Sequence, residues 1–242
     1  MTLKHRVKVL VVGKNDVNES DRVFSVFAPD FGKMEILGKS IRKINSKLKG
    51  GMNIFSLSEI EFVQGKNRKT LTDAVLVKSF LNIIHNFDKM IVAGRIIKVL
   101  NLFVKGQEND ERLFELLDNS FNKLNDENLR GGKNNFVYDY FLWNALSLFG
   151  YNLEVKKCVG CREKLIPHNI YFSAKEGGII CKKCFSNNGN AEEINSDIVK
   201  ILRIILSKDW ETLSRLRAQE TTQELLFKIS EKAVQTFCPA NC

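Results

Sequence analysis

Four cysteines are the residues whose type and spacing most clearly specify a chemistry in this 242-residue chain. Cys158 and Cys161 form one pair and Cys181 and Cys184 a second, in the pattern C-x2-C-x19-C-x2-C. Thiolates are preferred zinc ligands, and two such pairs supply the four ligands of a tetrahedral site. The spacing therefore predicts one structural Zn²⁺ held by all four sulfurs, which leaves no coordination position open for catalysis.

Two other interpretations of the cysteines stay open, namely a pair of redox-active C-x-x-C motifs or four unrelated buried thiols. His168 is a weaker candidate for one ligand position. Cys238 and Cys242 flank Pro239, and we expect them to belong to a free tail. Basic residues surround the predicted zinc site and can stabilise thiolates or meet an anionic partner: Lys156, Lys157, Arg162, Lys164, Lys182 and Lys183.

The composition is that of a folded protein, with 44% hydrophobic and 27% charged residues. Its length predicts two domains, and its net charge of +9 is concentrated in the first eighty residues and around the cysteines. Such basic patches favour nucleic acid or an acidic peptide as partner. Cysteines used for a metal indicate a reducing compartment, and neither a signal peptide nor a membrane span is apparent, so we expect a cytoplasmic protein.

Five short β-type runs follow one another in the first eighty residues, separated by turn residues. They are Val7–Val12, Arg22–Ala28, Met34–Leu37, Ile54–Val63 and Leu71–Val77. Five strands in a basic domain of this size predict an OB-fold, the five-stranded barrel that commonly binds single-stranded nucleic acid. A split sheet is the alternative.

A cluster of basic residues begins just before the third of these runs and continues between the third and the fourth. Its members are Lys33, Lys39, Arg42, Lys43, Lys47 and Lys49. Because Ile41, Ile44 and Leu48 are interleaved with them, we expect the apolar side chains to face the barrel and the charged ones to bind a phosphate backbone. Lys156, Lys157, Lys182 and Lys183 form a second predicted DNA contact. A solvated loop is the alternative for the first cluster.

The remainder of the chain has the apolar periodicity of helices. Helices are predicted at Val75–Val104, Asp110–Leu124, Phe136–Phe149, Asn195–Leu206 and Thr221–Phe237, with Asn109 or Asp110 and Ser196 as N-caps. The aromatic residues of 136–149 are expected in the core, not as a base-stacking platform. The predicted fold is thus α+β and multidomain: an OB-fold barrel at residues 1–80, then a helical domain at 81–242 with a zinc-knuckle insertion at 156–186.

No catalytic constellation is apparent, because His5, His85 and His168 are scattered and none lies near a nucleophile and a carboxylate. A binding protein is therefore favoured over an enzyme. Two rivals remain: an RNA-binding or ribosome-associated adaptor with the same barrel and knuckle, and a dithiol redox protein.

The run from Ser20 to Lys33, followed by Gly38-Lys39-Ser40-Ile41-Arg42-Lys43 and Ser46-Lys47-Leu48, resembles the N-terminal barrel of the RecO family of bacterial recombination mediators. Many members of that family also carry a four-cysteine zinc knuckle in a helical domain, as the four cysteines would here. The resemblance spans nearly the whole chain. It departs at Val12-Gly13-Lys14-Asn15, where the family usually has a tyrosine or an acidic residue after the first strand.

The resemblance implies a role in recombinational DNA repair by the RecF pathway. It implies binding of single- and double-stranded DNA, annealing of complementary strands, and a nucleoid-associated location. It also implies contact with RecR and with the acidic C-terminal tail of single-strand binding protein, so that RecA is loaded indirectly.

Overall fold

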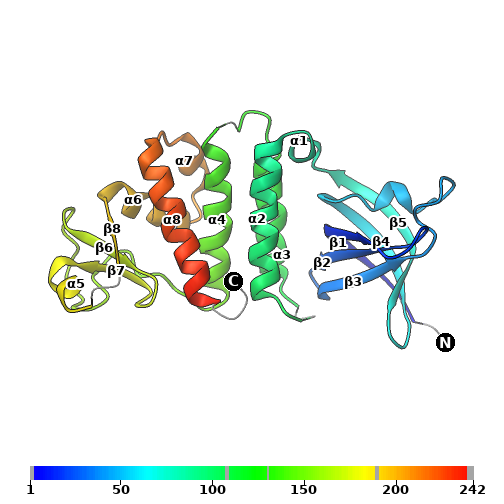
Figure 1. Cartoon of the computed structure of the whole chain (residues 1–242), viewed down its shortest axis with the longest axis horizontal. Helices are drawn as coiled ribbons and strands as arrows, with labels where there is room; N and C mark the ends of the chain where they lie inside the picture. The colour runs from blue at the N-terminus through cyan, green and yellow to red at the C-terminus, as the bar shows by residue number, and fades with distance from the viewer. Residues whose placement is uncertain (1–2, 107–108, 130, 189–190, 239–242) are drawn as a thin grey trace. The chain divides into compact units, whose positions relative to one another are not determined.

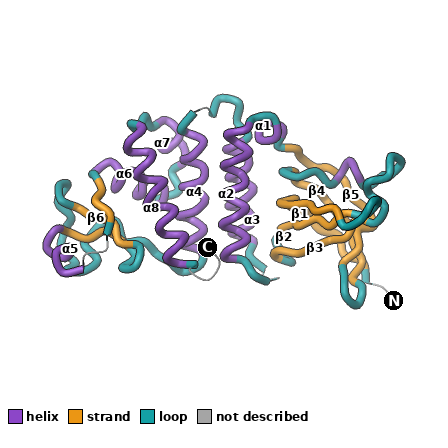
Figure 2. Tube along the Cα trace, in the orientation of Figure 1, coloured by secondary structure: helices purple, strands orange, loops and turns teal. Residues whose placement is uncertain are grey.

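The computed structural model describes residues 3–106, 109–129, 131–188 and 191–238. The chain forms two compact units, residues 1–128 and 129–242, and each is described by itself (Figures 1 and 2). The domain boundary expected at residue 80 stays a prediction. None of the helices within the described ranges is long and apolar enough to span a membrane.

A closed five-stranded barrel forms the first part of unit 1, with the strand order β1-β2-β3-β5-β4. Neighbouring strands are antiparallel except β3 and β5, which pair in parallel. Alternate apolar side chains fill the interior, as Val7, Val9 and Val11 do on the first strand. The predicted OB-fold barrel is confirmed. Its strands are β1 (Lys4–Asp16), β2 (Arg22–Ala28), β3 (Gly32–Gly38), β4 (Ser56–Gln64) and β5 (Lys69–Ser79).

Strand β1 is longer than predicted because it contains a bulge. Its register with β2 shifts between Val11 and Gly13 and then continues to Asp16, so residues 12–15 lie in the strand and the first turn is residues 17–21. A bulge interrupts the period of two, which is why the sequence pattern ends early. Gly13 fits this position because a Cβ there would lie 3.3 Å from Cβ of Ser25 on β2.

Three helices complete unit 1: α1 (Leu81–Ile84), α2 (Phe87–Phe103) and α3 (Glu111–Leu124). The helix predicted to start at Val75 is wrong at its beginning, because Val75–Val77 belong to β5 and are 41–50% exposed. Consecutive apolar residues on an exposed strand mimic the run of a buried helix. Phe87 and Ile91 were also expected inside but are 70% and 40% exposed.

Helix α3 packs its apolar face against the barrel. The Phe121 ring makes edge contacts with Phe55 and Phe80, and Phe114 stacks on Phe27 of β2 at 6.3 Å between ring centroids. The predicted N-cap Asp110 is confirmed, since its Oδ1 accepts a hydrogen bond from the Leu113 N–H at 2.9 Å. The helix therefore covers part of the outer face of β2.

Unit 2 is built around α4 (Lys133–Leu148), which contacts α6 (Ser196–Leu206), α7 (Trp210–Arg215) and α8 (Glu220–Phe237). As expected, the aromatic residues Tyr138, Phe141 and Trp143 of α4 are buried. The first cap of α6 is Asn195, not Ser196: its Oδ1 accepts hydrogen bonds from the N–H groups of Asp197 and Ile198. Cys238 is buried at the C-terminal end of α8, so the prediction of a free tail is wrong for it; Cys242 lies outside the described residues.

A three-stranded sheet, which the sequence analysis did not predict, lies in unit 2 with the strand order β7-β6-β8. It consists of β6 (Ile170–Ser173), β7 (Gly178–Cys181) and β8 (Glu192–Ile194), and the short helix α5 (Lys182–Asn188) follows β7. Strands of three or four residues are too short to show a periodicity. Glu192 of β8 joins this sheet to α8 through salt bridges to Lys228 (2.7 Å) and Lys232 (3.2 Å).

Candidate metal centre and nucleic-acid interface

The four cysteines come together from two separate segments of unit 2. Cys158 and Cys161 lie on a turn, Cys181 is the last residue of β7, and Cys184 lies in α5. Two hydrogen bonds tighten the turn, from the Arg162 N–H to the Cys158 carbonyl (2.8 Å) and from the Cys158 N–H to the Glu163 carbonyl (2.9 Å). A third joins it to β7, from the Val159 N–H to the Ile179 carbonyl (2.9 Å).

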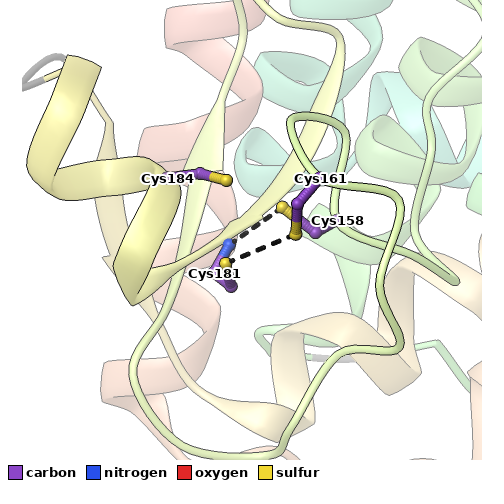
Figure 3. Close-up of side chains that lie close together, drawn as sticks. All are labelled: Cys158, Cys161, Cys181 and Cys184. Atoms are coloured by element: carbon purple, nitrogen blue, oxygen red, sulfur yellow. Dashed lines mark hydrogen bonds between the residues drawn. The ribbon is translucent and has the colours of Figure 1, made fainter.

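The four sulfurs point toward one another, and all lie within 4.8 Å of each other (Figure 3). A tetrahedral site with metal–sulfur bonds of about 2.3 Å has sulfur–sulfur edges of about 3.8 Å. The Cys161 and Cys181 sulfurs are 3.8 Å apart. The cluster could therefore hold one metal ion. His168 is exposed and is not part of this group.

Glycine is required inside the first pair. A Cβ at Gly160 would lie only 2.8 Å from the Cys184 sulfur, so a larger residue would push the two cysteine pairs apart. At Gly178, which begins β7, a Cβ would come within 2.5 Å of the Glu154 carbonyl oxygen. The sequence therefore permits close approach of the backbone at both sides of the cluster.

The electrostatics of the cluster favour a bound cation. Burial works against ionisation of Cys158, but backbone N–H groups such as those of Cys161 and Cys181 point at its sulfur and lower its pKa to about 6. The Cys158 sulfur in turn raises the pKa of Cys184 to about 12. A divalent ion would displace the thiol protons that remain and would stabilise the negative charge of the four sulfurs together.

The four basic residues predicted beside the knuckle, Lys156, Lys157, Lys182 and Lys183, are all exposed in unit 2. The backbone N–H groups of Lys156 and Lys157 donate to Glu154, which fixes the chain just before the first cysteine pair. Lys182 and Lys183 lie between the ligands of the second pair. Their contact with DNA stays a prediction.

The other predicted contact residues lie on β3 and on the basic segment, the name that we give to residues 39–49. This segment is a run of turns that ends at the first residue of the short 3-10 helix η1 (Lys49–Gly51). Lys39, Lys43, Lys47 and Lys49 are exposed, while Lys33 on β3 is half-buried. Ile41 is buried and Leu48 packs against the barrel core, as expected. Ile44 is 94% exposed, so the prediction that it faces inward is wrong. The turn at 43–46, with a hydrogen bond from the Ser46 N–H to the Lys43 carbonyl, carries it outward.

Arg42 differs from the lysines of the basic segment because its guanidinium is already engaged. It donates to the Asn18 carbonyl oxygen at 2.8 Å, and its Nε lies 3.6 Å from an Asp16 oxygen. This contact between the first turn and the basic segment was not predicted from the sequence. Three further basic residues near the β4–β5 turn were not predicted as contacts either, although their density in the sequence was a visible signal: Lys66, Arg68 and Lys69.

Comparison with known proteins identifies the family. The family described as "Recombination protein O N terminal" matches residues 1–80, and "Recombination protein O C terminal" matches residues 84–236. This chain belongs to the RecO family. The RecO family is one of DNA repair and recombination proteins, and the barrel and the helical region seen here correspond to its two parts.

Two relatives illustrate the breadth of the match to RecO. The "DNA repair protein RecO" of Dehalococcoides mccartyi (strain 195) is 31% identical over 219 residues, which are 90% of this chain and 85% of the relative. The "DNA repair protein RecO" of Caldanaerobacter subterraneus subsp. tengcongensis is 25% identical over 231 residues, which are 96% of this chain and 92% of the relative.

Proposed function

We propose that this RecO-family protein is a recombination mediator that binds DNA chiefly through the basic segment of its barrel. The observation that carries the proposal is the exposure of Lys39, Lys43, Lys47 and Lys49 on one continuous segment of turns that ends in η1. Within the described ranges, none of these four side chains forms a salt bridge. Ammonium groups that are not held in salt bridges can exchange condensed cations for phosphates.

The substrate class follows from the nature of these contacts. Lysines on turns read phosphate spacing and not base identity, so both single- and double-stranded DNA of any sequence are expected to bind. A protein that neutralises the phosphates of two complementary strands lowers their repulsion and thereby promotes annealing. As a member of the RecF pathway, the protein would act in the cytoplasm at the nucleoid. RecR and the acidic tail of single-strand binding protein are its proposed partners in helping RecA to load.

The four cysteines are proposed to hold one structural Zn²⁺. The ion would fix the turn at 158–161 to β7 and α5, and a closed set of four thiolates would leave it no catalytic role. Lys182 and Lys183, which lie within this knuckle, and Lys156 and Lys157 just before it are proposed to extend the DNA-binding surface.

An annealing assay tests the proposed function directly. Complementary strands coated with single-strand binding protein are mixed with and without the protein, and duplex formation is followed by fluorescence. We expect the protein to accelerate annealing, and the variant Lys39→Ala/Lys43→Ala/Lys47→Ala/Lys49→Ala to be impaired. Absence of acceleration by the wild type would contradict the mediator role. Preference for RNA over single-stranded DNA in a competition experiment would favour an RNA-associated adaptor instead.

A further inference from the structure

The first turn of the barrel, residues 17–21, contacts the beginning of the basic segment through a group of polar residues that we call the Asp21 cluster. Its members are Asp16, Asn18, Ser20, Asp21, Ser40 and Arg42. Four contacts cross between the turn region and the segment. Asp21 Oδ1 accepts from the Ser40 N–H at 2.7 Å, and the Ser20 carbonyl accepts from the Arg42 N–H at 3.0 Å. The other two are the Arg42 guanidinium contacts to Asn18 and Asp16.

Asp21 is itself held in place. Its Oδ2 accepts from Asn18 Nδ2 at 3.0 Å, and Ser20 Oγ donates to Oδ1 at 3.1 Å. The Asn18 Oδ1 accepts from the backbone N–H groups of Ser20 and Asp21, at 2.9 and 2.7 Å, which closes the turn around the carboxylate. The carboxylate therefore presents one oxygen to the segment from a fixed position.

The backbone that Asp21 contacts is strained. Ser40 has φ +53°, a left-handed conformation that residues with a Cβ rarely adopt. It directly follows Lys39 and precedes the buried Ile41, so its geometry sets the direction in which the chain leaves β3. A charge-assisted hydrogen bond to the Ser40 N–H offsets this strain.

We propose that Asp21 and Arg42 are positioning residues, which hold the basic segment against the first turn so that its lysines meet successive phosphates together. This inference rests on the proposed function and deepens it. Arg42 thereby acts through its contacts to the turn and not as a phosphate ligand. Asp21 likewise assists DNA binding although its own charge repels DNA.

The sign of the Asp21→Asn effect separates positioning from simple electrostatics. Removing a negative charge near a phosphate-binding surface strengthens DNA binding if charge alone matters. If positioning matters, Asp21→Asn weakens binding, because an asparagine has a single acceptor oxygen and cannot accept from both Asn18 Nδ2 and the Ser40 N–H as the two carboxylate oxygens do. A basic segment that is ordered for about one-fifth of the time binds DNA roughly fivefold more weakly. The matched control is Asp30→Asn, which makes the same charge change in the β2–β3 turn of the same barrel, where Asp30 is exposed. We expect Asp21→Asn to weaken and Asp30→Asn to keep or strengthen binding of a fluorescent oligothymidylate.

Arg42→Lys provides an independent test because it keeps the charge but loses the planar fork that reaches both Asn18 and Asp16. We expect Arg42→Lys to weaken binding about as much as Arg42→Ala. Arg112→Lys, the same change at an exposed arginine of α3 outside the basic segment, should bind as the wild type does. Full binding by Arg42→Lys would overturn the role of Arg42 in positioning; if Arg42→Ala is weakened at the same time, the charge of Arg42 contacts phosphate directly. The role of Asp21 would be overturned if the Asp21→Asn variant bound the oligothymidylate as tightly as the Asp30→Asn variant, or more tightly.

Hydrogen exchange distinguishes local release of the basic segment from unfolding of the whole barrel. In Asp21→Asn, the amides of Ser40 and Arg42 should lose protection while those of β1 and β4 keep theirs. If Asp21→Asn loses protection throughout the barrel, Arg42→Lys decides the proposal. Failure of the proposed function would appear differently: wild-type protein would not bind DNA, or replacement of the segment's lysines by alanine would not weaken it.

Discussion

At the scale of single residues, Cys181 tests the metal centre because it is the ligand whose backbone belongs to β7. Replacing it by serine should abolish stoichiometric zinc, since three thiolates and a hydroxyl hold Zn²⁺ less tightly than four thiolates. The protein should also unfold at a lower temperature, because metal-binding energy contributes to folding. Elemental analysis of protein purified without chelator checks the first result and thermal unfolding the second.

Cys238→Ala is the control for the metal content, since Cys238 is buried at the end of α8 and is not in the cluster. It should retain one zinc per chain even if its stability changes. Wild-type protein that contains no zinc, or Cys181→Ser that retains a full equivalent, would contradict the assignment.

Glu192 gives a pH-dependent prediction. The Lys228 ammonium lowers the pKa of this carboxyl below its usual value, with help from Lys232. Its salt bridges therefore stabilise the fold above the unfolded-state pKa of about 4.3, and this contribution is lost as pH falls through the lower folded-state pKa. Glu192→Gln should reduce the free energy of unfolding by less than about 1 kcal/mol near pH 7, because Lys228 is largely exposed.

Urea unfolding at several pH values measures this difference, which should shrink toward zero in acid. Glu193→Gln is the matched control, because Glu193 is the exposed neighbour on β8 and forms no salt bridge among the described residues. A stability loss of Glu192→Gln that grows as pH falls would show that the sign is wrong.

At the scale of elements, the basic segment should behave as one phosphate-binding unit. Replacing Lys39, Lys43, Lys47 and Lys49 by alanine should weaken single-stranded DNA binding for all sequences. It should also flatten the slope of log affinity against log salt by up to about 3, at about 0.7 per lost phosphate contact. Folding should be unaffected because these side chains are exposed, which circular dichroism can confirm.

An equal number of exposed lysines in unit 2 gives a comparison with this variant. The knuckle surface is tested in the same assay by a variant in which four lysines are replaced by alanine together: Lys156, Lys157, Lys182 and Lys183. If the segment variant keeps both affinity and slope while the knuckle variant loses them, the principal DNA path lies in unit 2.

Elements with strong local signals could be predicted from the sequence, and those shaped by tertiary contacts could not. Strand β2 was predicted at its observed bounds, because a short run rich in Val and Phe lies between two turns. Asp110 was found as a cap because acidic residues at this position pair with free N–H groups. The end of β1 was missed because the bulge depends on its pairing with β2. Asp21 carried no signal, since its partner Ser40 is nineteen residues away in the chain.

At the scale of the whole molecule, the two compact units should respond differently to loss of metal. A chelator should loosen β6, β7 and α5 in residues 129–242, because the cysteines that tie them together lie there. The barrel, which lies in residues 1–128, has its own apolar core. The contribution of the basic segment to DNA affinity and salt slope should therefore survive, and only the contribution of the knuckle lysines should be lost. Peptide-resolved hydrogen exchange and DNA titration of chelator-treated full-length protein test both parts. Equal loss of protection in both units would contradict their independence.

The pairing of β1 also bears on how the protein is made. The first half of this strand pairs with β4, from Lys4 opposite Val63 to Val11 opposite Ser56. The barrel is then closed by only two pairs between β3 and β5, Ile36 with Lys69 and Leu37 with Thr70. Contacts so distant in sequence carry a large loop-closure cost and form slowly. During synthesis the first strands therefore wait with their apolar faces uncovered until β5 has left the ribosome, and this interval is when the nascent chain is most exposed to aggregation.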